Sequence, residues 1–224
     1  MNHGSRNLLA VLAASCAFVL GGAAQAQADC PNADTVPTAE NLEVIRAALI
    51  CLHNEERRKA DVAVLRSDPR LTAAADKHAH DMVANRYFSH DAPTGLTPFD
   101  RMRREGYIGR GVVWNASETI AWASGSRTTP RIIMDSWLYS TSQRLTLLAP
   151  DFRDIGVGIA LGAPIERQPG AAPAVTYTID YGWRTTTRAL RRCLRKAQRK
   201  RRQAVRRGMR AKCHGLGSRG GLVR

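Results

Sequence analysis

The sequence predicts an α+β fold, with helices in its first part, a small antiparallel sheet after them and a basic extension at the end. Apolar residues recur at helical spacing over 39–60 and 68–88, whereas residues 174–183 alternate with a period of two. Charge divides the chain further: 16 of its 34 Lys and Arg residues, and no Asp or Glu, lie in residues 184–224. A chain of 224 residues can form one domain with a sizeable core and such an extension.

Residues 1–28 have the composition of a secretory signal peptide. Arg6 precedes an apolar run from Leu8 to Leu20, and the small residues that follow suit a signal peptidase. The run is too short to be read as a membrane span. We therefore predict a cleaved signal and a secreted, extracellular protein. A lead-in segment with the first cysteine (29–48), a globular domain (49–183) and the basic tail (184–224) follow.

Four helices are predicted from spacing and from the residues that begin them. The first spans residues 39–60, with apolar side chains on one face. The second begins at Asp68, a good N-cap, followed by Pro69 in the first turn. Thr-Pro pairs open the third and fourth helices, at residues 97–107 and 129–140.

Two strands are predicted after the helices, at residues 154–161 and 174–183, joined by a loop rich in Pro, Gly and Ala. Gly156 and Gly158 interrupt the first strand. Their pattern opens no helix, so it does not match a nucleotide-binding turn. We expect these glycines to permit close packing.

The predicted mature chain has four cysteines, and an even number in an exported protein favours disulfide bonds. Three pairings are open. The simplest joins Cys30 to Cys51 and Cys193 to Cys213, since each pair lies at one end of the chain. The second bond would bend the tail into a hairpin.

Seven segments in order resemble the motifs of the CAP superfamily (cysteine-rich secretory proteins, antigen 5 and pathogenesis-related 1), in its bacterial branch. They are LHNEER, YFSH, TPFDRMRREGY, SETIA, SWLYSTSQRLTLL, DFRDIGVGIA and YTIDYGW, and together they cover residues 51–183. The resemblance implies an α-β-α sandwich with a surface cleft, an extracellular location and, in many members, disulfides.

The resemblance also implies a cleft lined by histidines and acids, which in some members binds a divalent metal. His90 matches the first histidine and Glu118 the acid, whereas Gln143 stands where the second histidine is expected. Thr119 also replaces an asparagine of the motif. Zinc sites need three or four ligands, so a zinc site formed by His90 and Glu118 alone is incomplete.

A His–Glu pair has other uses. Glu118 could orient His90 as a general base, or the two could only tie a helix end to the sheet. His78 is expected to be a buried helix residue rather than a ligand, and His80 to lie on another face. Asn54 and Arg57 of the LHNEER motif are expected to satisfy backbone groups where helix and sheet meet.

Three functions remain open from the sequence. We favour a binding module over an enzyme, with an unidentified small molecule or peptide in the cleft and the tail retained by anionic polymers or lipids of the cell envelope. Export argues against nucleic acid as a natural partner. The alternatives are an extracellular hydrolase, such as a protease, that uses His90 and Glu118, and a structural domain that carries a membrane-active cationic tail. No nucleophile motif supports the hydrolase.

Overall fold

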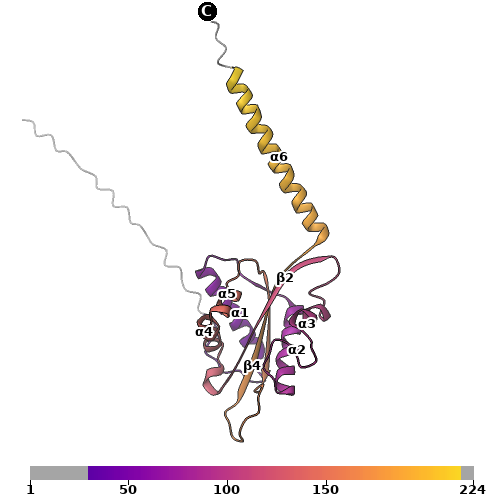
Figure 1. The fold of residues 1–224 in the computed structure, drawn as a ribbon. Helices are drawn as coiled ribbons and strands as arrows, with labels where there is room; N and C mark the ends of the chain where they lie inside the picture. Colours follow the sequence, from indigo (N-terminus) through magenta and orange to yellow (C-terminus); the bar gives the residue numbers. More distant parts are fainter. Residues whose placement is uncertain (1–29, 218–224) are drawn as a thin grey trace, which may run out of the picture.

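The protein has three layers, a four-stranded sheet between two layers of helices (Figure 1). The computed structural model describes residues 30–217, with side chains as far as residue 205, so the predicted signal peptide lies outside the described residues. This arrangement confirms the α-β-α sandwich. One layer contains α1 (Leu42–Lys59), α4 (Pro130–Tyr139) and α5 (Thr141–Leu147), and the other contains α2 (Pro69–Asn85) and α3 (Pro98–Arg104).

The sheet has the strand order β1-β3-β4-β2. β3 is parallel to β1 and antiparallel to β4, which in turn is antiparallel to β2. β2 was not predicted as a strand, because small and polar residues along it obscure the alternation, yet all 13 of its residues pair with β4. The strands are β1 (Arg66–Ser67), β2 (Val112–Ser124), β3 (Asp154–Leu161) and β4 (Ala174–Thr186), and a 3-10 turn covers Gly125–Thr128.

The helix starts follow the local sequence signals. The Asp68 side chain accepts a hydrogen bond from the Arg70 backbone N–H at 2.9 Å. Thr97 and Asp100 form a reciprocal capping box at the start of α3. Such caps satisfy backbone donors that have no partner within the helix.

A disulfide joins Cys30 to Cys51, which confirms the predicted N-terminal pair. The bond ties the lead-in segment to α1. Because α1 begins at Leu42, the expected boundary between residues 48 and 49 falls within this helix. Ile45 and Ala48, on the lead-in side of that boundary, are buried in the domain.

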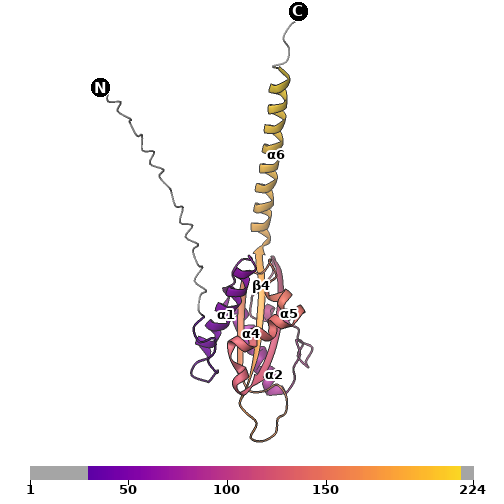
Figure 2. The same cartoon turned by 90° about the vertical axis from the view of Figure 1, so that its left-hand side faces the viewer.

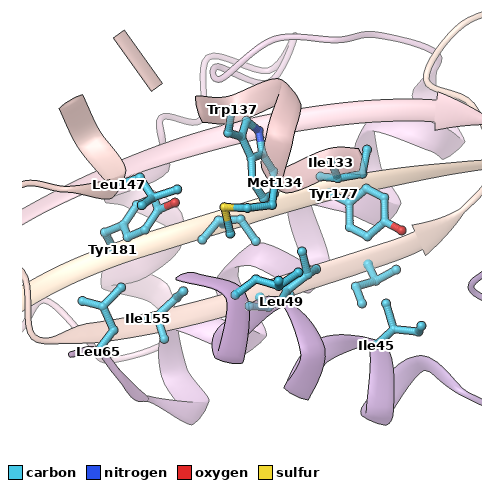
Figure 3. Close-up of a cluster of buried hydrophobic side chains, with 14 of the residues drawn as sticks. Ile45, Leu49, Leu65, Ile133, Met134, Trp137, Leu147, Ile155, Tyr177 and Tyr181 are labelled. Atoms are coloured by element: carbon cyan, nitrogen blue, oxygen red, sulfur yellow. The ribbon is translucent and has the colours of Figure 1, made fainter. Parts of the chain in front are cut away.

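The main core lies between the sheet and the layer of α1, α4 and α5 (Figure 3). Trp137 of α4 is fully buried there, and its indole N–H donates to the Ile120 carbonyl of β2. Burial of aromatic and branched side chains is the main force that holds the layers together. The other large side chains of this core include Ile45, Leu49, Ile133, Met134, Leu147, Ile155, Tyr177 and Tyr181.

On the other face, α2 packs directly on the backbone of β3. A Cβ atom added to Gly156 would overlap the backbone at Leu71, and one added to Gly158 would overlap the backbone at Ala75. The absence of side chains at both glycines therefore sets how closely α2 approaches the sheet. This confirms the expectation that these glycines permit close packing.

Gly158→Ala is expected to lower the free energy of unfolding by about 2 kcal/mol, since α2 would have to move away from β3. Gly109→Ala is the matched control, because its Cβ would come no closer than 3.9 Å to a neighbouring atom. Urea denaturation of both variants measures the difference. Equal free energies of unfolding for Gly158→Ala and Gly109→Ala would show that the close approach of α2 to β3 does not contribute to stability.

The basic tail forms one helix, α6 (Thr187–Gly217), that projects away from the domain (Figures 1 and 2). The predicted bond between Cys193 and Cys213 is wrong, and so is the hairpin. Twenty residues of helix separate their Cα atoms by about 30 Å, whereas a disulfide needs less than about 7 Å. Cys193 is a free, exposed thiol. Among the described helices, none is both long and apolar enough to cross a membrane.

Candidate functional site

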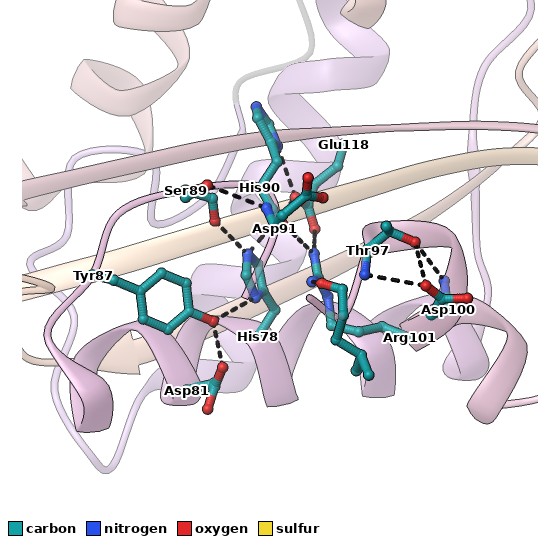
Figure 4. A network of polar contacts seen from close by, with 11 residues as sticks. His78, Asp81, Tyr87, Ser89, His90, Asp91, Thr97, Asp100, Arg101 and Glu118 are labelled. Carbon is teal, nitrogen blue, oxygen red and sulfur yellow. Dashed lines mark hydrogen bonds and ion pairs between the residues drawn. The ribbon is translucent and has the colours of Figure 1, made fainter. Parts of the chain in front are cut away.

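A cluster of charged and polar side chains lies between the sheet and the layer of α2 and α3 (Figure 4). Each of its five members comes from a different segment, so only the folded chain brings them together. They are His78 of α2, His90 of the following loop, Arg101 of α3, Glu118 of β2 and Asp180 of β4.

Glu118 is the centre of the cluster, and its side chain is only 1% exposed. Its Oε1 accepts a hydrogen bond from His90 Nδ1 at 2.8 Å, and its Oε2 accepts one from Arg101 Nη2 at 2.7 Å. A buried carboxylate requires such charged partners, because burial without them would be very unfavourable. The sequence-predicted pair of His90 and Glu118 is therefore in direct contact.

His90 forms the exposed edge of the cluster, with 52% of its side chain accessible. The hydrogen bond to Glu118 raises the pKa of His90 above its usual value, and burial opposes this only in part. Nδ1 is held by the carboxylate, whereas Nε2 makes no hydrogen bond to any of the described residues. Glu118 therefore fixes the orientation of the ring, and Nε2 faces the solvent.

Arg101 connects the loop, α3 and β2. Besides Glu118, its guanidinium donates to the backbone carbonyl of His90 at 2.9 Å and to that of Leu96 at 3.1 Å. The side chain is only 7% exposed. Arg101 therefore neutralises Glu118 and holds the loop that carries His90.

His78 and Asp180 complete the cluster behind Glu118. The Nε2 of His78 lies 3.0 Å from the Ser89 carbonyl oxygen and 3.8 Å from Glu118 Oε1, and burial lowers the pKa of His78. Asp180 is opposite Glu118 in the strand register, and neither of its carboxyl oxygens accepts a hydrogen bond from a described residue. Burial and the facing Glu118 raise the pKa of Asp180 well above its usual range. The raised pKa favours the protonated, neutral form of Asp180.

The described residues do not fit a zinc site. No group of three or more His, Cys, Asp or Glu side chains among residues 30–205 is arranged to hold a metal ion. Gln143 approaches the same strand, but its amide lies 3.4 Å from the Ile120 carbonyl oxygen of β2. Both Glu118 oxygens already accept hydrogen bonds, one of them from the cation Arg101, which disfavours a second cation there.

The motif residues of α1 lie on the opposite face of the sheet. Asn54 bonds both the N–H and the carbonyl of Leu65. His53 lies 2.7 Å from the Leu49 carbonyl oxygen and 2.8 Å from the Tyr181 hydroxyl, and burial lowers its pKa to about 4. Tyr181 also lies 3.4 Å from the hydroxyl of Thr119. These residues stabilise the fold and do not reach the cluster.

Sequence reasoning did not include Arg101 and Asp180 in the site and set His78 apart from it. His78 is buried, as expected, and His80 is exposed on another face of α2, but His78 also contacts the cluster. No local pattern marks Arg101 among the basic residues of α3. The alternation of β4 does place Asp180 on the face opposite Tyr181, which is a usable signal once β2 is known to be its neighbour.

Comparisons with known proteins agree with this fold. Residues 50–181 match the model of the cysteine-rich secretory protein family, CAP. The uncharacterized protein YkwD of Bacillus subtilis (strain 168) is 31% identical over 137 residues, 61% of this chain and 51% of YkwD, so the chain spans about half the length of this curated relative.

Solved structures that match the chain include two bacterial surface or extracellular proteins. An extracellular protein containing an SCP domain from Bacillus anthracis strain Ames shares 27% identity over 65% of this chain and 43% of its own, with a TM-score of 0.48. An outer surface protein from Borrelia burgdorferi shares 20% identity over 67% of this chain and 97% of its own, with a TM-score of 0.49. The family model matches more than half of the residues of this chain. The chain therefore belongs to the cysteine-rich secretory protein family, CAP.

Proposed function

We propose that the protein is an exported binding module whose cluster at His90 takes a ligand with a carboxylate or similar anionic group. The observation that supports this most directly is the ring of His90, which is half-exposed, held at Nδ1 by buried Glu118 and open at Nε2. A protonated imidazole fixed in this way donates a charge-assisted hydrogen bond to an anionic acceptor.

The balance of charge in the cluster supports the same ligand class. Arg101 compensates Glu118, while the raised pKa of Asp180 and the lowered pKa of His78 favour the neutral form of each residue. Protonated His90 then leaves the cluster with a net positive charge. An anionic group at Nε2 would neutralise it. A cationic ligand would meet repulsion instead.

The hydrolase hypothesis remains a prediction of the sequence. The contact between His90 and Glu118 has the form of a base and its orienting acid. No hydroxyl or thiol of the described residues forms a hydrogen bond to His90 Nε2, however, so no nucleophile is in position. We therefore favour binding over turnover.

The tail supports retention at the envelope. Thirteen Lys and Arg residues and no acidic residue lie in Thr187–Gly217, so any anionic polymer or lipid of a cell envelope attracts this segment. Membership of a family of secretory proteins agrees with an exported location. In this proposal the domain binds its ligand while the tail keeps it near the cell.

The test is a titration with N-acetyl-Ala-Ala, with its carboxylate free or amidated, followed by NMR of the histidine rings. We expect the free acid to shift the His90 resonances saturably and the amide to bind several-fold more weakly. Binding should weaken as pH rises through the raised pKa of His90, because the deprotonated ring has lost its positive charge.

His80→Ala is the matched control for His90→Ala, since His80 is an exposed histidine of α2 outside the cluster. Only His90→Ala should abolish binding. Equal affinity of the two variants for the free acid would contradict the role of His90. Turnover of a peptide substrate that disappears only in His90→Ala would favour the hydrolase instead.

A further inference from the structure

α6 follows β4 directly and extends away from the domain as one helix (Figure 2). Its 31 residues correspond to a length of about 46 Å. Among the described residues, its hydrogen bonds to the rest of the chain lie at the first turn, where Thr187 donates to the Gly111 carbonyl. Most of the helix surface as far as residue 205 therefore has no partner among the described residues.

The charges of α6 oppose its own folding. Arg188, Arg192 and Lys196 follow one another at four-residue spacing, and like charges at this spacing destabilise a helix. No acidic residue of the tail offsets them. A second copy of the chain would add the same positive charge, so the partner that stabilises α6 has to be anionic.

An apolar stripe runs along the same helix. Leu190, Leu194, Ala197 and Val205 lie on one side at helical spacing, and Arg201 interrupts this stripe between Ala197 and Val205. Leu194 is 54% and Val205 53% exposed, although both are large and apolar. A soluble anionic polymer would compensate the charges and leave this stripe in water, whereas a lipid surface also buries the stripe.

Basic side chains cover the rest of the helix surface. A shallow hollow of about 580 Å³ beside the first turns is lined by Arg188, Arg192 and Lys196 together with Ala189 and Cys193, on the side of α6 away from the stripe. When the stripe enters the acyl boundary, long basic side chains beside it can reach the phosphate groups above. Charge and apolar surface are thus arranged as in an interfacial helix.

We propose that α6 lies along an anionic lipid surface, with Leu194 and Val205 in the acyl boundary and the basic rows at the phosphate groups. This rests on the proposed retention by the tail and specifies its partner. The apolar stripe and the basic residues both lie in α6, outside the His90 cluster. Lipid binding by α6 therefore does not depend on the ligand of that cluster.

The test uses protein without residues 1–28 and vesicles of phosphatidylglycerol or of phosphatidylcholine, with soluble polyphosphate as a lipid-free polyanion. We expect binding to phosphatidylglycerol and not to phosphatidylcholine. Leu194→Ala/Val205→Ala keeps all charges and a good helix former at both positions. It should lower the affinity for phosphatidylglycerol vesicles at least about tenfold and leave the affinity for polyphosphate unchanged.

Two further variants complete the test. Leu145→Ser removes another exposed leucine, from α5, and should change neither affinity. Leu194→Phe should raise the affinity for phosphatidylglycerol vesicles. Unchanged vesicle binding in both the double variant and Leu194→Phe would overturn the lipid proposal but leave an electrostatic tether. Absence of binding to vesicles and to polyphosphate would overturn the tether as well.

Discussion

Arg57→Ala is expected to lower the free energy of unfolding by about 4 kcal/mol. The Arg57 side chain is fully buried, and its guanidinium donates to four backbone carbonyls. The substitution would leave these carbonyls without a donor and open a cavity between α1 and the loop before β3. The acceptors are Ala63 at 2.7 Å, Leu147 at 2.6 Å, Ala149 at 3.1 Å and Phe152 at 3.3 Å.

Urea denaturation measures this effect, with Arg58→Ala as the control. Arg58 is the next residue of α1 and is exposed, so its replacement loses the same charge without the buried bonds. We expect the control to stay within about 0.5 kcal/mol of the unchanged protein. Arg57→Lys should recover only part of the loss, because one ammonium cannot span the same carbonyls. A cost below about 1 kcal/mol for Arg57→Ala would contradict this role.

Glu118→Gln is expected to cost about 3 kcal/mol of stability and to lower the pKa of His90. The substitution leaves the buried guanidinium of Arg101 without its carboxylate. It also replaces the charged acceptor of the hydrogen bond that is the main reason for the raised pKa of His90 with a neutral amide. NMR titration of the histidine rings and urea denaturation follow the two effects separately.

The pH dependence of stability provides an independent readout of the same contact. A histidine whose pKa is raised by folding stabilises the native state below its unfolded pKa, near 6.5. This contribution to the free energy of unfolding is lost as pH rises through the raised pKa of His90. The contribution should be absent in Glu118→Gln. Asp91→Asn removes an exposed acid beside His90 and should retain it. An unchanged pKa of His90 in Glu118→Gln would show that the contact is not what raises it.

Local sequence signals were sufficient for much of the fold. The cap at Asp68 and the Thr97-Pro98 start produced helices where they were expected, because N-caps act within a few residues. β3 begins and ends at the predicted residues, since its apolar run is bounded by turns. The resemblance of ordered motifs then supplied the three-layer arrangement, which periodicity alone does not determine.

The site depended on contacts between distant segments. His90 and Glu118 were found from motifs, but the partners that decide their charge, Arg101 and Asp180, lie 17 and 62 residues from Glu118. β2 was missed because it is an edge strand whose pairing with β4, rather than its own pattern, makes it a strand.

The sequence by itself determined the starts of α2, α3 and α4, the close packing at Gly156 and Gly158 and the concentration of positive charge in the tail, and it favoured the Cys30–Cys51 pair among three open pairings. Only the tertiary structure decided that His78, Arg101 and Asp180 join His90 and Glu118 in the site, and that Cys193 and Cys213 lie far apart on one helix. The physical reason is range. Caps, turns and charge depend on residues close together in the sequence. Contacts between distant segments, and the pKa shifts that burial causes, arise only after those segments have packed.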